Sequence, residues 1–240
     1  MEPGTTLSIV IPAYNEEENL PELMKEIRNT FANRVKPSEV ILVDDGSTDH
    51  TLEIMLQLKN EYTDLPIRVL TFDRNYGLSA ALDAGFHHAT GEWIVSLDSD
   101  LQNDPADIPK LLEKLHEYDA VIGIRGKRQD SFVKKSSSKI ANGIRDFTLN
   151  ETWRDTGCTL KAYRRSFLER LKLFDGLHRF LPTLLKMEGA RIFEMEVNHR
   201  HRIHGKSKYH LWNRLIGPLR DLMAVRWMKQ RHFRYRVEEK

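Results

Sequence analysis

The sequence contains a single cysteine, Cys158, and no apolar run long enough to cross a membrane. One cysteine excludes an internal disulfide and suits a reducing cytoplasm. A spanning helix requires roughly 18 to 20 consecutive apolar residues. No basic-then-apolar leader precedes the first apolar run at Leu7, so we expect neither a secretion signal nor a membrane span. These absences favour a cytoplasmic protein.

The two common glycine-rich nucleotide loops are also missing. No G-x-G-x-x-G follows the first apolar run, and no G-x-x-x-x-G-K-S/T occurs anywhere in the chain. The sequence therefore excludes a dinucleotide site of the usual kind. A nucleotide would have to be held by acids and a metal instead. Nor do we expect a nucleic acid as a partner.

What is present is an alternation of β-forming apolar runs with helical patterns. Such alternation implies right-handed crossovers and a mainly parallel sheet covered by helices on both faces. The 240 residues suffice for one large α/β domain or two small ones. The predicted strands cover residues 7–12, 39–43, 67–71, 93–97, 120–124, 158–163 and 191–197, and the predicted helices 20–31, 51–62, 78–88, 105–117, 139–149, 164–173 and 178–188.

The fourth predicted strand ends in two carboxylates, Asp98 and Asp100, separated by one residue. Side chains two apart on an extended chain point the same way, and two adjacent carboxylates repel unless a cation lies between them. Mg²⁺ and Mn²⁺ prefer oxygen ligands, and Gln102 could add a carbonyl oxygen. We predict a divalent metal here. The alternative is a polar turn that caps the following helix.

Polar residues follow all of the first five predicted strands. In parallel sheets, ligands bind beyond the carboxyl ends of the strands. We therefore expect one site at this edge of the sheet. The polar groups are Tyr14 to Glu16, Asp44 to Ser47, Arg74 and Asn75, Asp98 to Gln102, and Arg125 to Arg128.

Two basic segments follow. The stretch RGKRQDSFVKKSSSK, with Arg128, Lys134 and Lys135, predicts a loop that closes over an anionic substrate, or else a solvated surface segment. The stretch HRHRIHGKSKY carries Arg202 and Lys208. Its histidines could suggest zinc, but no Cys or acid completes a tetrahedral set. Bidentate Arg and point-charge Lys instead favour a phosphate clamp.

The last thirty residues form a basic tail. Between Lys206 and Arg236 there are nine Lys or Arg and one acid, Asp221. Apolar residues recur at helical spacing, interrupted by Pro218. Such a helix could lie on an anionic membrane, pack on its own domain, or contact a sister chain. We expect a catalytic domain over residues 1–210 and an amphipathic tail over 211–240. The recurring apolar residues are Trp212, Leu215, Ile216, Leu219, Met223 and Trp227.

Six motifs occur in order: IPAYNEEENL, VDDGSTDHT, RNYGLSAALDAGF, GEWIVSLDSDLQNDP, RDTGC and RIHGKSKY. Through them nearly the whole chain resembles glycosyltransferase family 2 enzymes of GT-A fold, and within these the dolichyl-phosphate mannose synthase-like polyprenyl-phosphate glycosyltransferases. The resemblance implies a Rossmann-like sheet, Mg²⁺ or Mn²⁺, and inverting transfer of a hexose from GDP-mannose or a UDP-sugar to a membrane polyprenyl phosphate.

The resemblance also implies roles for individual residues. It assigns the nucleoside to Pro12, Tyr14, Glu16, Val43 and Asp45, the metal and diphosphate to Asp98, Asp100 and Gln102, and phosphate contacts to Arg125, Arg202 and Lys208.

The acceptor decides whether a catalytic base is required. A phosphate monoester, with a second pKa near ~6, is already a nucleophile at neutral pH. A sugar hydroxyl needs a base, and Asp155 is the best-placed carboxylate. In either case, the metal with Arg202 and Lys208 would stabilise the leaving diphosphate.

Many relatives carry C-terminal membrane spans, and we predict none in these 240 residues. The basic tail could attach the protein to the cytoplasmic face of the membrane. Alternatively, a separate membrane partner or a homodimer could provide this attachment. A third possibility is that the acceptor is not a lipid, so that no attachment is needed. Two rivals remain: a metal-dependent nucleotidyltransferase, which would carry a Gly- and Arg-rich loop after the first strand, and a non-catalytic nucleotide-sugar-binding scaffold on a membrane surface.

Overall fold

The computed structural model describes residues 6–34, 36–126, 143–201, 216–233 and 238. The chain divides into two compact units. The first comprises residues 1–129 and 154–207, and the second comprises residues 130–153 and 208–240.

A seven-stranded sheet forms the first unit, in the order β3-β2-β1-β4-β6-β5-β7. All pairings are parallel except those of β6, which runs antiparallel to both β4 and β5. The predicted mainly parallel sheet is thus confirmed. Its strands are β1 (Leu7–Ala13), β2 (Glu39–Asp44), β3 (Ile67–Thr71), β4 (Trp93–Ser96), β5 (Ala120–Arg125), β6 (Lys161–Arg164) and β7 (Ile192–Val197).

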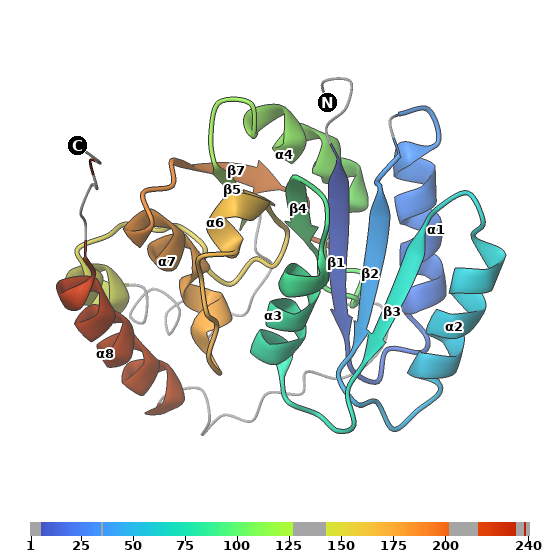
Figure 1. The fold of residues 1–240 in the computed structure, drawn as a ribbon, viewed down its shortest axis with the longest axis horizontal. Helices are drawn as coiled ribbons and strands as arrows, with labels where there is room; N and C mark the ends of the chain where they lie inside the picture. Colours follow the sequence, from blue (N-terminus) through green and yellow to red (C-terminus); the bar gives the residue numbers. More distant parts are fainter. Residues whose placement is uncertain (1–5, 35, 127–142, 202–215, 234–237, 239–240) are drawn as a thin grey trace. The chain divides into compact units, whose positions relative to one another are not determined.

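Helices cover both faces of this sheet (Figure 1). Alternate residues of β1 point to opposite faces. Ile9 and Ile11 join the core that contains the apolar sides of α1, α2 and α4, whereas Val10 faces α3. A Cβ on Gly85 of α3 would collide with Val10, so the glycine permits this close approach. These helices are α1 (Leu20–Phe31), α2 (Thr51–Glu61), α3 (Leu78–His88) and α4 (Ile108–Lys114), the last preceded by η1 (Pro105–Asp107).

Glu39 ties the first three strands together from a buried position. Its carboxylate accepts hydrogen bonds from Ser8 Oγ at 2.6 Å, Thr90 N at 2.7 Å and Arg68 Nη1 at 2.5 Å. Burial alone would raise the pKa of Glu39, but these hydrogen bonds outweigh it and lower the pKa to about 2. The carboxylate is therefore ionised in the fold.

Two predicted elements are shorter in the structure, and tertiary contacts explain both. The helix expected over 164–173 spans only α6 (Arg165–Leu168), because Leu173 N donates to Asp83 of α3 instead of continuing the helix. The strand expected over 158–163 begins only at Lys161. In the residues before it, the Thr159 carbonyl accepts from Ser96 Oγ, outside the strand ladder.

The helix expected over 178–188 consists of two shorter elements, η2 (Leu177–Phe180) and α7 (Leu181–Met187). Pro182 lies near the start of α7, where its missing N–H costs no helical hydrogen bond.

The second unit contains helical residues 143–149 and α8 (Ile216–Arg231). Lys229 of α8 donates to the Leu149 carbonyl at 2.5 Å and to the buried Glu151 carboxylate at 2.7 Å. Glu151 also accepts from Trp153 Nε1 at 2.8 Å. Pro218 lies in the first turn of α8 and does not interrupt it, contrary to the sequence prediction. Among the described helices, none is long and apolar enough to cross a bilayer.

Candidate active site

The rim at the carboxyl ends of β1 and β2 is held by backbone-to-hydroxyl hydrogen bonds. Asn15 N donates to Ser47 Oγ at 3.0 Å, and Glu16 N donates to Thr51 Oγ1 at 2.8 Å. The structure thus brings together two of the predicted strand ends. Two predicted donor-binding residues, Pro12 and Val43, are buried neighbours across the two strands, while Tyr14 and Glu16 are half-buried just beyond them.

Two rim residues have an unusual backbone. Asn15 has φ 52° and Leu101 has φ 61°, in the left-handed region that non-glycine residues rarely occupy. Both lie in motifs singled out from the sequence, at the ends of β1 and β4. Leu101 is buried. Backbone strain of this kind persists where the surrounding structure enforces it, often at functional sites.

Asp45 organises the loop after β3. Its carboxylate accepts hydrogen bonds from Tyr76 N at 2.7 Å, Gly77 N at 2.9 Å and Asn75 Nδ2 at 2.9 Å. Burial raises the pKa of Asp45, and the charge of Asp44 adds to the rise, against hydrogen bonds that lower it. Asp45 therefore links the ends of β2 and β3, in addition to its predicted contact with the nucleoside.

The D-x-D acids lie directly after β4, as expected. Asp98 is half-buried and Asp100 is buried. Asp100 Oδ1 accepts from Gln102 N at 3.1 Å, and the Gln102 carbonyl accepts from Arg200 N at 2.8 Å. The loop is thereby fastened to the segment that follows β7.

These residues fit a metal that is shared with a ligand. Within the described parts of the chain, no three His, Cys, Asp or Glu side chains converge as a complete cage. Mg²⁺ is usually held by only one or two carboxylates together with substrate phosphates. The hard oxygens of Asp98 and Asp100 match that pattern.

Asp155 is brought beside β5 because β6 inserts between β4 and β5. Arg125 Nε lies 2.7 Å from Asp155 Oδ2, and Arg125 Nη2 lies 2.8 Å from Oδ1. Asp155 also accepts from the backbone N–H groups of Arg125 at 3.2 Å and Gly157 at 3.1 Å. With only 5% of its surface exposed, Asp155 is a buried acid in a bidentate ion pair.

Lys161 is a charged residue of this region that we did not single out from the sequence. It is 3% exposed, and its Nζ donates to the Thr156 carbonyl at 3.3 Å. The only sequence signal was a lysine within an otherwise apolar strand pattern, TLKAY. Its place beside the acids depends on the pairing of β6 with β4.

The structure describes only some of the basic residues that were predicted to bind phosphates or the acceptor. Arg125 lies at the site, as described. Arg200, which belongs to the motif predicted as a phosphate clamp, pairs instead with the protein's own acids, Glu26 at 2.6 Å and Asp104 at 2.9 Å. The other predicted phosphate and acceptor-loop residues lie outside the described residues; these are Arg128, Lys134, Lys135, Arg202 and Lys208.

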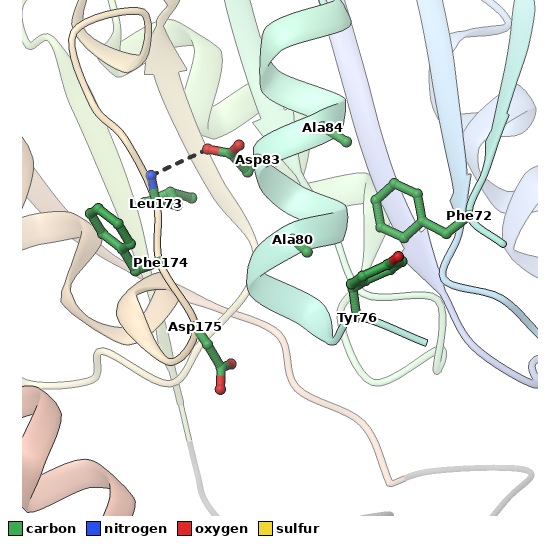
Figure 2. A pocket seen from close by; sticks show the side chains of 8 residues that line it. All are labelled: Phe72, Tyr76, Ala80, Asp83, Ala84, Leu173, Phe174 and Asp175. Atoms are coloured by element: carbon green, nitrogen blue, oxygen red, sulfur yellow. Dashed lines mark hydrogen bonds between the residues drawn. The ribbon is translucent and has the colours of Figure 1, made fainter. Parts of the chain in front are cut away.

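A cavity of about 310 Å³ lies over α3, apart from the predicted site residues (Figure 2). Phe72 and Tyr76 form one wall, and the segment from Leu173 to Asp175 forms the other. Asp83 of α3 accepts from Leu173 N at 3.2 Å and so fastens the second wall to the helix. None of the residues predicted to hold donor or metal lines this cavity.

Comparisons with solved structures identify the fold. Glucosyl-3-phosphoglycerate synthase from Mycobacterium tuberculosis, in complex with Mn²⁺, uridine diphosphate and glucosyl-3-phosphoglycerate, matches with a TM-score of 0.70 at 19% identity, over 94% of this chain and 80% of that chain. The same enzyme with Mg²⁺ and uridine diphosphate matches with a TM-score of 0.68 at 20% identity, over 94% and 79%. The predicted GT-A fold is confirmed.

Comparisons with curated sequences identify the family. The family model "Glycosyl transferase family 2" matches residues 8–172. The undecaprenyl-phosphate 4-deoxy-4-formamido-L-arabinose transferases of Salmonella choleraesuis (strain SC-B67) and Salmonella typhimurium (strain LT2) are each 40% identical over 223 residues, which is 92% of this chain and 68% of each relative. The chain therefore belongs to glycosyl transferase family 2 and is a glycosyltransferase.

Proposed function

We propose that the protein transfers a sugar from a nucleotide-diphosphate sugar to a polyprenyl phosphate, with inversion at the anomeric carbon. The observation that carries this proposal is the 40% identity, over 92% of the chain, to transferases named for undecaprenyl phosphate. A hexose donor stays a prediction, because those relatives are named for an arabinose derivative.

The donor would lie along the rim of β1, β2 and β4. Pro12, Tyr14, Glu16, Val43 and Asp45, which lie at or just beyond the ends of β1 and β2, would contact the nucleoside. Asp98, Asp100 and Gln102 would hold Mg²⁺ or Mn²⁺, which when bound neutralises charge on the leaving diphosphate. The two acids follow β4, the neighbour of β1, so one ligand could reach both groups.

The acceptor side supports a mechanism without a general base. An acceptor phosphate oxygen would form a bond to the anomeric carbon while the bond from that carbon to the diphosphate oxygen breaks. The acceptor is already anionic at neutral pH. Asp155, the candidate base for a hydroxyl acceptor, has both oxygens bound by Arg125. A hydroxyl acceptor would require that buried pair to open, which makes it the less supported alternative.

The second unit offers a surface suited to an anionic membrane. Leu219, Met223 and Trp227 lie four residues apart on α8 and are 49%, 60% and 63% exposed. Exposed arginines, Arg220 and Arg226, accompany them. Exposed apolar side chains with basic neighbours are typical of helices that lie on anionic lipid surfaces. A second copy of the chain, or a membrane-anchoring partner, could instead cover the stripe.

The testing experiment combines donor and acceptor. A thermal-shift panel of UDP- and GDP-sugars with Mn²⁺ would identify the donor, since a ligand bound only by the native state raises Tm. The labelled donor is then incubated with undecaprenyl phosphate. Labelled polyprenyl-phosphate sugar is the expected product. Transfer only to saccharides would favour the hydroxyl acceptor, nucleotidyl transfer would favour the rival enzyme class, and donor binding without turnover would favour the scaffold.

A further inference from the structure

The residues that follow β7 run against the loop that carries the D-x-D acids. Asn103 and His199 pair in an isolated antiparallel bridge, and the next residue, Arg200, donates its backbone N–H to the Gln102 carbonyl at 2.8 Å. Asn103 is buried and donates from Nδ2 to Thr159 Oγ1 at 3.0 Å. The loop after β4 is therefore held between the segment before β6 and the segment after β7.

Arg200 also contacts the side chain of Gln102, the residue that we expect to complete the metal site. Gln102 Nε2 donates to the Arg200 carbonyl at 3.4 Å. A glutamine amide carries its donor and its acceptor on separate branches, so a bond that engages Nε2 directs the Oε1 oxygen away from Arg200. Partners that orient a metal-binding side chain in this way tune the affinity for the metal. The backbone of Arg200 thus holds both the main chain and the side chain of Gln102.

The guanidinium of Arg200 fixes that backbone in turn. Its Nη1 lies 2.6 Å from Glu26 Oε1 on α1, and its Nη2 lies 2.9 Å from Asp104 Oδ1. Burial alone would raise the pKa of Asp104, but hydrogen bonds from Ala106 N and Arg200 outweigh burial and lower the pKa. Asp104 is therefore ionised. With both branches of its guanidinium occupied by acids of the protein, Arg200 is suited to hold the loop.

Glu26 is the acid that carries this anchor. The bond to Asp104 needs only an oxygen acceptor, which an asparagine would also supply. Glu26 instead lies on α1, a helix that packs on the sheet through a row of buried residues. Its second oxygen, Oε2, is buried and has no hydrogen bond among the described residues. A buried carboxylate that lost its cation would be uncompensated, so the pair with Arg200 is held firmly.

We propose that Arg200 is a positioning residue for the metal: it anchors the loop after β4 to α1 and thereby orients the Gln102 oxygen toward the ion. This inference rests on the metal role of Asp100 and Gln102 in the proposed function. It gives Arg200 a role different from the phosphate clamp predicted for its motif. Arg200 contributes to the binding of a metal with a diphosphate without touching either one.

The test is a double-mutant cycle between Arg200→Met and Gln102→Ala in the full chain. Calorimetry measures the binding of UDP and of GDP, each with Mn²⁺ and with EDTA, which isolates the metal-dependent part of the affinity. Each single variant should weaken the Mn²⁺-dependent affinity by about tenfold, as loss of an outer partner of a metal site does. Because Arg200 acts through Gln102, the double variant should also lose about tenfold. A loss of about a hundredfold, the product of the two single effects, would overturn the proposal.

Arg164→Met is the matched control. Arg164 also lies between two acids, Glu92 and Asp119, and its side chain is 29% exposed against 36% for Arg200. It pairs with the first residue of β4, at the end of the strand opposite to the D-x-D acids. Arg164→Met should lower Tm, as Arg200→Met does, but keep the Mn²⁺-dependent affinity of the wild type. Equal losses of affinity in the two variants would reduce Arg200 to a merely structural residue.

A further variant covers the case in which Arg200→Met does not fold. Glu26→Met combined with Arg200→Met replaces the ion pair by apolar side chains, a change that is often neutral or stabilising. This variant should fold and should show the same tenfold loss of Mn²⁺-dependent affinity. Wild-type affinity would contradict the proposal, and so would failure to fold, since the loop and not the fold should depend on Arg200.

Failure of this inference can be told apart from failure of the proposed function. If Gln102→Ala keeps wild-type affinity while Asp100→Ala loses it, the metal site stands and the role of Arg200 falls. If Asp100→Ala keeps it as well, or if neither nucleotide binds with Mn²⁺, the metal assignment of the proposed function has itself failed.

Discussion

The Arg125 guanidinium binds both carboxylate oxygens of Asp155, with Nε 2.7 Å from Oδ2 and Nη2 2.8 Å from Oδ1. Paired Arg–carboxylate bonds of this kind are strong and directional. Two backbone N–H groups add further bonds to the same carboxylate. The arrangement fixes Arg125 at the end of β5 and leaves Asp155 poorly suited to accept a proton.

Replacing Asp155 with Asn tests this reading. The amide oxygen can still accept from Arg125, so turnover on a polyprenyl phosphate should fall by less than about tenfold, whereas loss of a general base costs roughly 10²-fold or more. Steady-state kinetics over a range of pH measure the effect. Arg125→Gln serves as the comparison, since it should raise KM for phosphate-bearing substrates. If Asp155→Asn loses nearly all turnover, Asp155 must transfer a proton or position the acceptor.

Replacing Asp100 with Ala should abolish metal-dependent donor binding and leave the fold intact, because the side chain lies in a loop after β4 and outside the apolar core. Calorimetry with the selected nucleotide sugar and Mn²⁺ measures the affinity, and circular dichroism checks the fold. Asp104→Asn is the control: Asp104 is an acid of the same loop that caps η1 and pairs with Arg200. Wild-type donor affinity in Asp100→Ala would disprove the metal assignment.

The exposed stripe of α8 should govern membrane attachment. Changing Leu219, Met223 and Trp227 together to Ala should weaken binding to vesicles of anionic lipid by tenfold or more. The reason is that burying apolar area contributes about 25 cal/mol of binding free energy per Å², and the variant has less apolar area to bury. Sedimentation with the vesicles measures the bound fraction. Leu56→Ala is the control, since Leu56 is equally an exposed apolar residue but lies on α2. If the triple variant instead loses self-association and keeps its vesicle binding, the stripe is a contact between copies.

Glu39 should make stability fall in acid. Its pKa is lowered in the fold from 4.5 to about 2, so it contributes stability that is present above pH 4.5 and is lost as the pH falls through 2. The difference corresponds to about 3 kcal/mol at most. Urea unfolding of wild type and Glu39→Gln at pH 7, 4.5 and 2.5 measures it. The variant should be less stable at pH 7 and should lose less stability between pH 4.5 and 2.5. Parallel pH curves for the two proteins would contradict the assignment.

Local patterns predicted most of the first unit. The bounds of β3 and α3 are those expected, and α1 covers the residues 20–31 predicted for it. Periodicity suffices in such elements because the same residues that set the pattern also form the core. The D-x-D acids were found for the same reason, since they end a strand that the pattern defines.

What could not be predicted depends on pairing between distant segments. The antiparallel insertion of β6 joins Lys161 to Ser96, 65 positions earlier in the chain, and no local pattern encodes that contact. Asp155 was selected from the sequence, but its ion pair with Arg125 was not. On α8 the periodicity was read correctly as helical, yet Leu222 and Val225 are buried there, while Leu219, Met223 and Trp227 are exposed.

The neighbouring positions of β5 and β6 have a consequence for how such enzymes could diversify. Residues 126–160 leave the sheet from one strand and return on the adjacent one, where Ile122 pairs with Lys161. Both ends of this excursion are thus anchored side by side. A chain of different length or composition could be grafted between these anchors without shifting β1, β2 or β4, the strands at whose ends we propose the donor site.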